Sequence, residues 1–126
     1  MKITTTLSSL FILIMFFGCS EMDKSYQEPL PELVTYETNI KAILDQSCVR
    51  CHGGSEIIMN LNLSSYNEIE ERIGTDVSSD IIVPGNSFST LLRKTNPEGS
   101  MYIYLNDYRE YELLEQWIVI DSAAEN

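Results

Sequence analysis

The five residues from Cys48 to His52 constrain this chain more than any other feature. They read Cys-Val-Arg-Cys-His, so two thiols stand three positions apart and the only histidine of the chain follows the second. On one turn of helix, both thiols can reach the vinyl groups of a single porphyrin, and the imidazole can then bind its iron. The pattern predicts one haem c per chain, attached through Cys48 and Cys51, with His52 as an axial iron ligand.

Two other uses of the same residues are weaker. A structural zinc site needs four ligands, and beyond this motif the sequence offers Cys19 as the only further thiol and no second histidine. A thioredoxin-like redox pair normally opens a helix after a strand, and no strand-like segment precedes Cys48. Both alternatives therefore rank below haem attachment.

An electron-transfer haem usually has a second axial ligand, and methionine is the obvious candidate here. The chain has five methionines, of which those in the N-terminal region are Met1, Met15 and Met22. Met59 follows His52 too closely to cross easily to the opposite haem face, so we interpret it as a core filler. Met101 lies in a loop before the final helix and is the favoured ligand. An open sixth position that holds water stays an alternative.

The N-terminus indicates export. Residues 10–17 are an unbroken apolar stretch, too short to span a bilayer, and Gly18-Cys19 follows it. This is typical of a bacterial lipoprotein signal peptide covering residues 1–18, with Cys19 as the lipidated residue. Ordinary secretion with an unmodified Cys19 is the alternative. We expect an exported protein, anchored by lipid on the periplasmic side of a bacterial membrane or at the cell surface.

The remainder is predicted to be a flexible tether over residues 19–33 and one domain over residues 34–126. The formal net charge of the whole chain is −11, which disfavours nucleic acid as a partner. An acidic surface favours docking to a basic patch on a redox partner protein, although it equally serves solubility.

Apolar spacing predicts an all-α domain of about four short helices. The first begins at Thr35 as N-cap and leads into Cys48. A second covers residues 66–73 and stops at Gly74. Ser87 is the expected cap of a third. The last helix begins at Asp107, which forms a variant of the capping box with Glu110.

Several segments together resemble a small monohaem c-type cytochrome of the planctomycete-type domain. The matching segments are residues 40–44, the motif at 48–53, residues 61–63 with Tyr66, residues 82–87 with Leu91 and Leu92, Met101, and residues 114–118. The resemblance implies a cytochrome c-like fold in which the first and last helices cross near the haem edge. It also implies that Pro84 lies near His52 and orients its ring through a backbone carbonyl. The family commonly has proline after its ligand methionine, whereas Tyr102 follows Met101 here.

The expected function is electron transfer by a membrane-anchored carrier, without substrate chemistry of its own. The alternative is a peroxidase or a small-gas-binding haem module with an open sixth position. For a peroxidase, Glu98 and Arg93 are the nearest candidates for distal acid-base groups.

Overall fold

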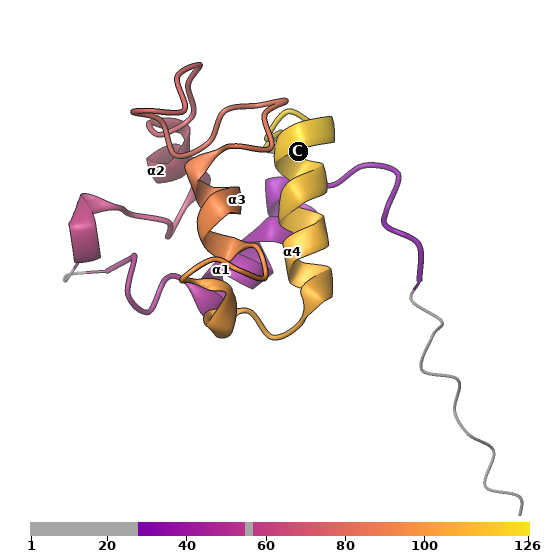
Figure 1. Ribbon diagram of the computed structural model, residues 1–126, viewed down its shortest axis with the longest axis horizontal. Helices are drawn as coiled ribbons and strands as arrows, with labels where there is room; N and C mark the ends of the chain where they lie inside the picture. Colours follow the sequence, from indigo (N-terminus) through magenta and orange to yellow (C-terminus); the bar gives the residue numbers. More distant parts are fainter. Residues whose placement is uncertain (1–27, 55–56) are drawn as a thin grey trace, which may run out of the picture.

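The computed structural model describes residues 28–54 and 57–126 (Figure 1). The expected signal peptide, Cys19 and most of the expected tether therefore lie outside the described residues. Within the described part, no helix is both long enough and apolar enough to cross a membrane.

The described residues form short helices and no strand, which confirms the all-α class. The four α-helices are α1 (Lys41–Ser47), α2 (Tyr66–Glu70), α3 (Thr90–Thr95) and α4 (Tyr108–Glu115). Further helical segments are the π-helical turns η1 (Tyr36–Ile40) and η4 (Gln116–Ile120) and the 3-10 turns η2 (Ile58–Asn60) and η3 (Tyr102–Tyr104). Since η1 runs directly into α1 and α4 into η4, the first and last helices are each longer than their α-helical portion.

Two of the expected helix starts are present. The Thr35 side chain accepts a hydrogen bond from the Thr38 N–H (3.3 Å) at the start of η1, and the Asp107 side chain accepts one from the Glu110 N–H (3.1 Å) at the start of α4. The return contact of the capping box is displaced by one residue, because the Glu110 carboxylate accepts from the Asn106 N–H (2.9 Å).

The prediction that Ser87 caps the third helix is wrong. Ser87 is exposed, and α3 begins later, with Ser89 in the N-cap position. Ser89 makes no capping bond because its buried hydroxyl is used inside the preceding loop. Its Oγ accepts the Val83 N–H (2.9 Å) and donates to the Asn86 carbonyl (2.8 Å). The apolar loop before α3 thus determines where the helix starts.

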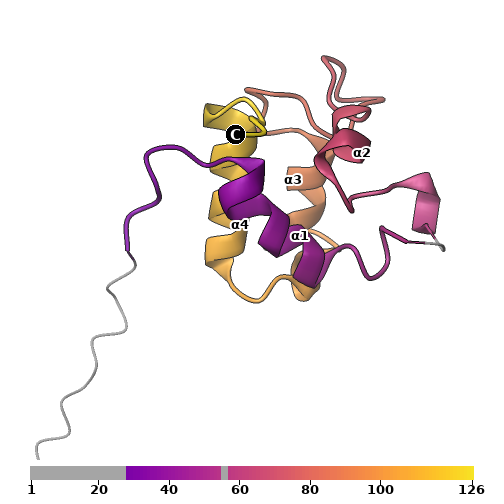
Figure 2. The ribbon, with the colours of Figure 1, turned by 180° about the vertical axis from the view of Figure 1, so that it is seen from behind.

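The core joins the two ends of the domain. Tyr36 of η1 and Trp117 of η4 are almost fully buried, and their ring centroids lie 6.4 Å apart. The backbone N–H groups of Tyr36 and Glu37 donate to the carbonyls of Ala124 (2.9 Å) and Glu125 (3.1 Å). Figures 1 and 2 show the first helix crossing α4, with α3 beside them.

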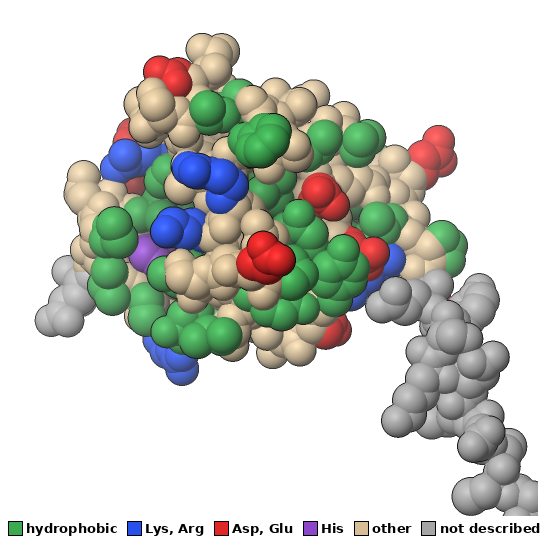
Figure 3. All heavy atoms as spheres, viewed as in Figure 1, with side chains coloured by type: hydrophobic (Ala, Val, Ile, Leu, Met, Phe, Trp, Pro, Cys, Tyr) green, Lys and Arg blue, Asp and Glu red, His purple; other side chains and the backbone are tan. Residues whose placement is uncertain are grey.

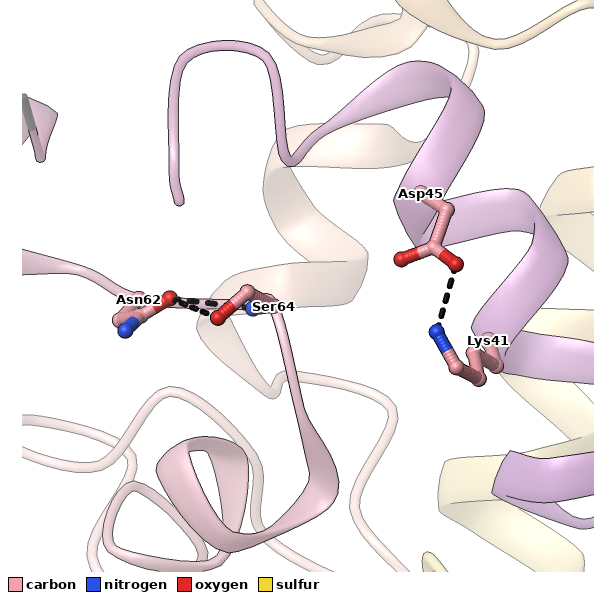
Figure 4. Close-up of polar contacts among 4 residues, drawn as sticks. All are labelled: Lys41, Asp45, Asn62 and Ser64. Atoms are coloured by element: carbon pink, nitrogen blue, oxygen red, sulfur yellow. Dashed lines mark hydrogen bonds and ion pairs between the residues drawn. The ribbon is translucent and has the colours of Figure 1, made fainter. Parts of the chain in front are cut away.

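Two local polar contacts support the segments on either side of the motif (Figure 4). On α1, Lys41 Nζ and Asp45 Oδ2 form an exposed ion pair at 2.6 Å. After the motif, Asn62 Oδ1 accepts from the backbone N–H (3.1 Å) and the hydroxyl (2.7 Å) of Ser64, which fixes the turn before α2.

Candidate functional site

The Cys48–His52 motif forms a helical turn at the C-terminal end of α1. Cys48 donates its N–H to the Leu44 carbonyl (2.8 Å) and so continues the hydrogen bonding of the helix. The N–H groups of Cys51 (3.1 Å) and His52 (2.8 Å) both donate to the Cys48 carbonyl. The buried residues of α1, Ile43 and Leu44, anchor this turn to the core.

Two glycines let the chain leave the motif. A Cβ atom at Gly53 would lie 2.6 Å from Cγ1 of Val49, so a side chain there would displace the motif turn. Gly54 has φ +76°, a conformation that other residues rarely adopt. The chain can therefore turn directly after His52, and the segment at Ile58 comes back into contact with the His52 ring.

A backbone carbonyl orients the imidazole of His52. Its Nδ1 lies 3.2 Å from the carbonyl oxygen of Ile58. Since a carbonyl only accepts, this contact requires the proton on Nδ1 and leaves the lone pair of Nε2 for a metal. Hydrogen bonds of this kind fix the orientation of histidine ligands and raise their basicity.

The structure gives Ile58 the role expected for Pro84. Pro84 does not line the cavity described below, and the N–H of the next residue, Gly85, donates to the Ile118 carbonyl (2.8 Å) in η4. The loop that contains Pro84 is thus bonded to η4 and to Ser89, whereas the segment after Gly54 supplies the carbonyl that contacts His52.

The motif opens onto a cavity of about 340 Å³. Cys48, Cys51, His52 and Met101 all line it, so the four residues that the sequence predicts to bind haem line the same cavity. Its apolar walls are formed by Ile58, Met59, Leu61, Leu63, Ile81 and Leu91, and its remaining lining residues are Ser47, Arg50, Thr90, Lys94, Thr95 and Tyr104. Figure 3 shows the histidine among hydrophobic side chains on this face.

Met101 and Met59 both line the cavity, but different segments hold them. Met59 directly follows the Ile58 carbonyl that contacts His52, and it is 85% exposed with φ 60°, so its interpretation as a core filler is wrong. Met101 is half-buried, and its N–H donates to the Lys94 carbonyl (2.8 Å) at the end of α3. Because Met59 is tied to the His52 side, Met101 is better placed to approach from another side.

The loop before Met101 packs tightly onto α3. Gly99 donates its N–H to the Asn96 carbonyl (2.7 Å), and a Cβ atom at this glycine would collide with the Lys94 carbonyl. Arg93 and Glu98, considered as distal acid-base groups, do not line the cavity. Arg93 instead donates to the Thr90 hydroxyl (3.1 Å), and Glu98 is exposed.

Neither motif thiol is in a disulfide. Burial, reinforced by the charges of Glu110 and Cys51, raises the pKa of Cys48 to about 11. Redox-active Cys-x-x-Cys pairs show the opposite direction, a depressed pKa. Among residues 28–54 and 57–126, no group of three or more His, Cys, Asp and Glu side chains is arranged to hold a metal ion. The two thiols and the imidazole thus share a cavity without converging on one point.

Sequence reasoning did not identify Ile58, Arg50 or Lys94 as parts of the site. Ile58 contacts His52 through its backbone carbonyl, so the identity of its side chain does not indicate this contact in the sequence. Arg50 is inside the motif and Lys94 is on an amphipathic helix, where a cation is ordinarily a solvated residue.

The chain was compared with protein-family models, curated proteins and solved structures. None of them matches it.

Proposed function

We propose that this protein is a c-type cytochrome that carries single electrons through one covalently bound haem. One observation carries the proposal: Cys48, Cys51, His52 and Met101 line a single, largely apolar cavity. Two thiols, an imidazole and a thioether are the groups that such a haem requires, and they come from two segments far apart in the sequence. The residues present fit the cofactor.

A haem bound here would supply an iron that accepts one electron from a donor protein and releases it to an acceptor. The chain itself positions and insulates that centre. Cys48 and Cys51 would hold the porphyrin as thioethers, and the Ile58 carbonyl keeps Nε2 of His52 free to bind iron. The apolar walls restrict water, and a Met101 thioether would raise the reduction potential relative to stronger donors.

The helix arrangement agrees with a cytochrome c-like fold. The resemblance implies contact between the first and last helices, with Tyr36, Ile40, Tyr111, Leu114 and Trp117 as candidate contact residues. Four of them are buried, Tyr111 is half-buried, and η1 packs against α4. This helix contact supports the proposed fold. The cavity lies beside α1 and α3, away from the contact between η1 and α4.

The decisive test is production of the full chain in a bacterium with a working haem c maturation system. We expect the mass of one haem per chain, haem staining that survives a denaturing gel, and a low-spin ferric spectrum with a thioether charge-transfer band. A chain without added porphyrin mass would overturn the proposal. A high-spin ferric haem that turns over peroxide would replace the carrier by the peroxidase.

Lipid anchoring at Cys19 is a separate part of the proposal. We expect labelled palmitate to be incorporated into the protein and the Cys19→Ala variant to lose it, while haem attachment continues. Equal labelling of the variant would exclude Cys19 as the lipidated residue.

A further inference from the structure

The segment η2, which directs a carbonyl at His52, is built from backbone that most residues avoid. Its residues Met59 and Asn60 have φ 60° and 55°, and neither is a glycine. Left-handed backbone at such residues costs free energy and persists only where other contacts hold it. Figures 1 and 2 show η2 at the edge of the domain, apart from the four α-helices. The turn therefore needs a contact from elsewhere in the chain.

Arg72 supplies that contact. Its Nη2 donates to the Asn60 carbonyl at 2.6 Å, and the two residues are 12 positions apart in the sequence. Because the guanidinium is charged, this hydrogen bond is stronger than one between neutral groups. Within residues 28–54 and 57–126, the side chain of Arg72 forms no ion pair and no other hydrogen bond. The guanidinium is thus used for η2 alone.

The backbone of Arg72 is fixed independently of its side chain. Its N–H donates to the carbonyl of Ile69 in α2 (2.8 Å), and its carbonyl accepts the N–H groups of Ile81 (3.1 Å) and Ile82 (3.2 Å). Ile69 and Ile82 are fully buried in the core. A rigid part of the domain therefore presents the guanidinium to η2.

The contact between Arg72 and Asn60 lies outside the cavity. Neither residue lines it, although Ile58 and Met59 do. A haem in the cavity would therefore leave this contact in place. Two hydrogen bonds separate Arg72 from the proposed iron ligand: the first joins it to Asn60, and the second joins the Ile58 carbonyl to Nδ1 of His52 (3.2 Å).

We propose that Arg72 is a positioning residue for the axial ligand His52. By holding the left-handed pair Met59 and Asn60, its guanidinium keeps the Ile58 carbonyl at Nδ1 of the ring. A carbonyl at Nδ1 makes Nε2 a stronger donor, which favours ferric over ferrous iron and lowers the reduction potential. The inference rests on the proposed function and adds a residue that tunes the axial bond without touching the haem.

The sign of the change in reduction potential tests the proposal. In haem-loaded Arg72→Met, which keeps an apolar stem and removes the donor, we expect the potential to rise because the Ile58 carbonyl leaves the ring. The ferric–ferrous equilibrium constant should change about two- to tenfold, the range for one hydrogen bond, or at most about 60 mV. Loss of a positive charge alone acts in the opposite direction, since a nearby cation favours the less positive ferrous state. An unchanged or lower potential overturns the proposal.

Arg109 offers a matched control. Its Nη2 also donates to a backbone carbonyl, that of Pro29 (2.8 Å), but from α4. Arg109→Met removes the same charge and the same kind of hydrogen bond, and it should not raise the potential. Arg72→Lys keeps a charge and a donor, and it should change the equilibrium constant less than about twofold. An equal rise in Arg109→Met and Arg72→Met overturns the proposal.

Solvent exchange of the Nδ1 proton of His52 is a readout that a merely structural role would not move. It is recorded by NMR in the haem-loaded, low-spin ferrous protein, which is diamagnetic. We expect exchange about two- to tenfold faster in Arg72→Met than in the wild-type chain, while backbone amides of α4 keep their rates. Equal ring exchange, or acceleration that is uniform across the domain, overturns the proposal.

A graded series keeps the test decisive if Arg72→Met does not fold. Arg72→Lys retains a charged donor, whereas Arg72→Gln has a shorter, neutral one. The Nδ1 proton of His52 should therefore exchange faster in Arg72→Gln than in Arg72→Lys. Equal rates in these two variants overturn the positioning role.

The outcomes separate this inference from the proposed function. If the protein carries one haem with a low-spin spectrum, but neither its potential nor its ring exchange depends on Arg72, the positioning role fails and the cytochrome remains. If the chain contains no haem, the proposed function fails, and the role of Arg72 towards the iron is withdrawn with it.

Discussion

The Nδ1 atom of His52 and the carbonyl oxygen of Ile58 lie 3.2 Å apart, across the turn that follows the motif. This contact links the only histidine to a segment whose backbone is unusual, since Met59 and Asn60 both have positive φ (60° and 55°). The left-handed backbone of Met59 and Asn60 turns the chain directly after Ile58. The carbonyl of Ile58 is thereby directed at the imidazole of His52. Orientation of the imidazole is therefore a property of the loop as well as of the motif.

Replacement of His52 by Ala removes the proposed axial ligand. We expect the yield of correctly haem-loaded, folded protein to collapse, because the cavity would then lack the imidazole proposed to bind the haem iron. Covalent mass and the ferrous absorption spectrum measure it. Normal yield with an unchanged spectrum would contradict the assignment of the site.

Replacement of Met101 by Ala should lower the reduction potential and let ferrous iron bind carbon monoxide, while haem stays attached. Potentiometry and the carbon monoxide difference spectrum measure the two effects. Met59→Ala is the control, because Met59 lines the same cavity from the His52 side. An unchanged spectrum in Met101→Ala would exclude it as ligand, and a changed one in Met59→Ala would transfer that role.

Replacement of Gly99 by Ala tests the loop that holds Met101. The added methyl group would meet the Lys94 carbonyl, which accepts the Met101 N–H. We expect weakening of the thioether charge-transfer band and a loss of about 1–3 kcal/mol of unfolding free energy, typical of overpacking. Urea unfolding and absorption spectroscopy measure both. Ser100→Ala, at an exposed neighbour, should change neither.

Replacement of Ser89 by Ala should destabilise the domain by about 1–3 kcal/mol, because the buried Val83 N–H loses its acceptor. Ser87→Ala should have almost no effect, since that side chain is exposed and caps no helix. Urea unfolding of the two variants compares them directly. Equal destabilisation would show that the loop does not depend on the Ser89 hydroxyl.

The phenol of Tyr111 should titrate late. Burial, and then the nearby Glu115 carboxylate, raise its pKa to about 12. Because the folded pKa exceeds the usual value of 10.0, this group's contribution to stability is complete below pH 10 and is lost as the pH rises towards 12. Absorbance at the phenolate band, compared with Tyr111→Phe, measures it. A Tyr111 transition near pH 10 would be inconsistent with the structure.

Local signals predicted the parts of the fold that local chemistry controls. Thr35 and Asp107 cap their helices as expected, because a side-chain oxygen three residues before an N–H needs only the adjacent backbone. Cys48, Cys51 and His52 share one face because the motif continues α1. Met101 reaches the same cavity through the hydrogen bonding of its loop to α3, which the sequence indicated only by loop length.

The features that sequence reasoning missed depend on contacts between distant residues. Ser87 is as suitable a cap as Ser89 in sequence terms, and only the buried loop before α3 distinguishes them. Pro84 was expected beside His52, but the loop that contains it is bonded to η4 through Gly85. Met59 and Asn60 have left-handed backbone although neither is a glycine, so the sequence did not predict a turn there or the contact of the Ile58 carbonyl with His52.

The backbone bonds from Tyr36 and Glu37 to residues 124 and 125 have a consequence for biogenesis. A polypeptide that crosses a membrane with its N-terminal end first cannot close this domain until those final residues have emerged. Throughout that interval the Cys-x-x-Cys-His segment is already outside and still accessible. If the proposed haem attachment takes place after export, this topology would leave the motif open to the attaching enzyme until the domain closes.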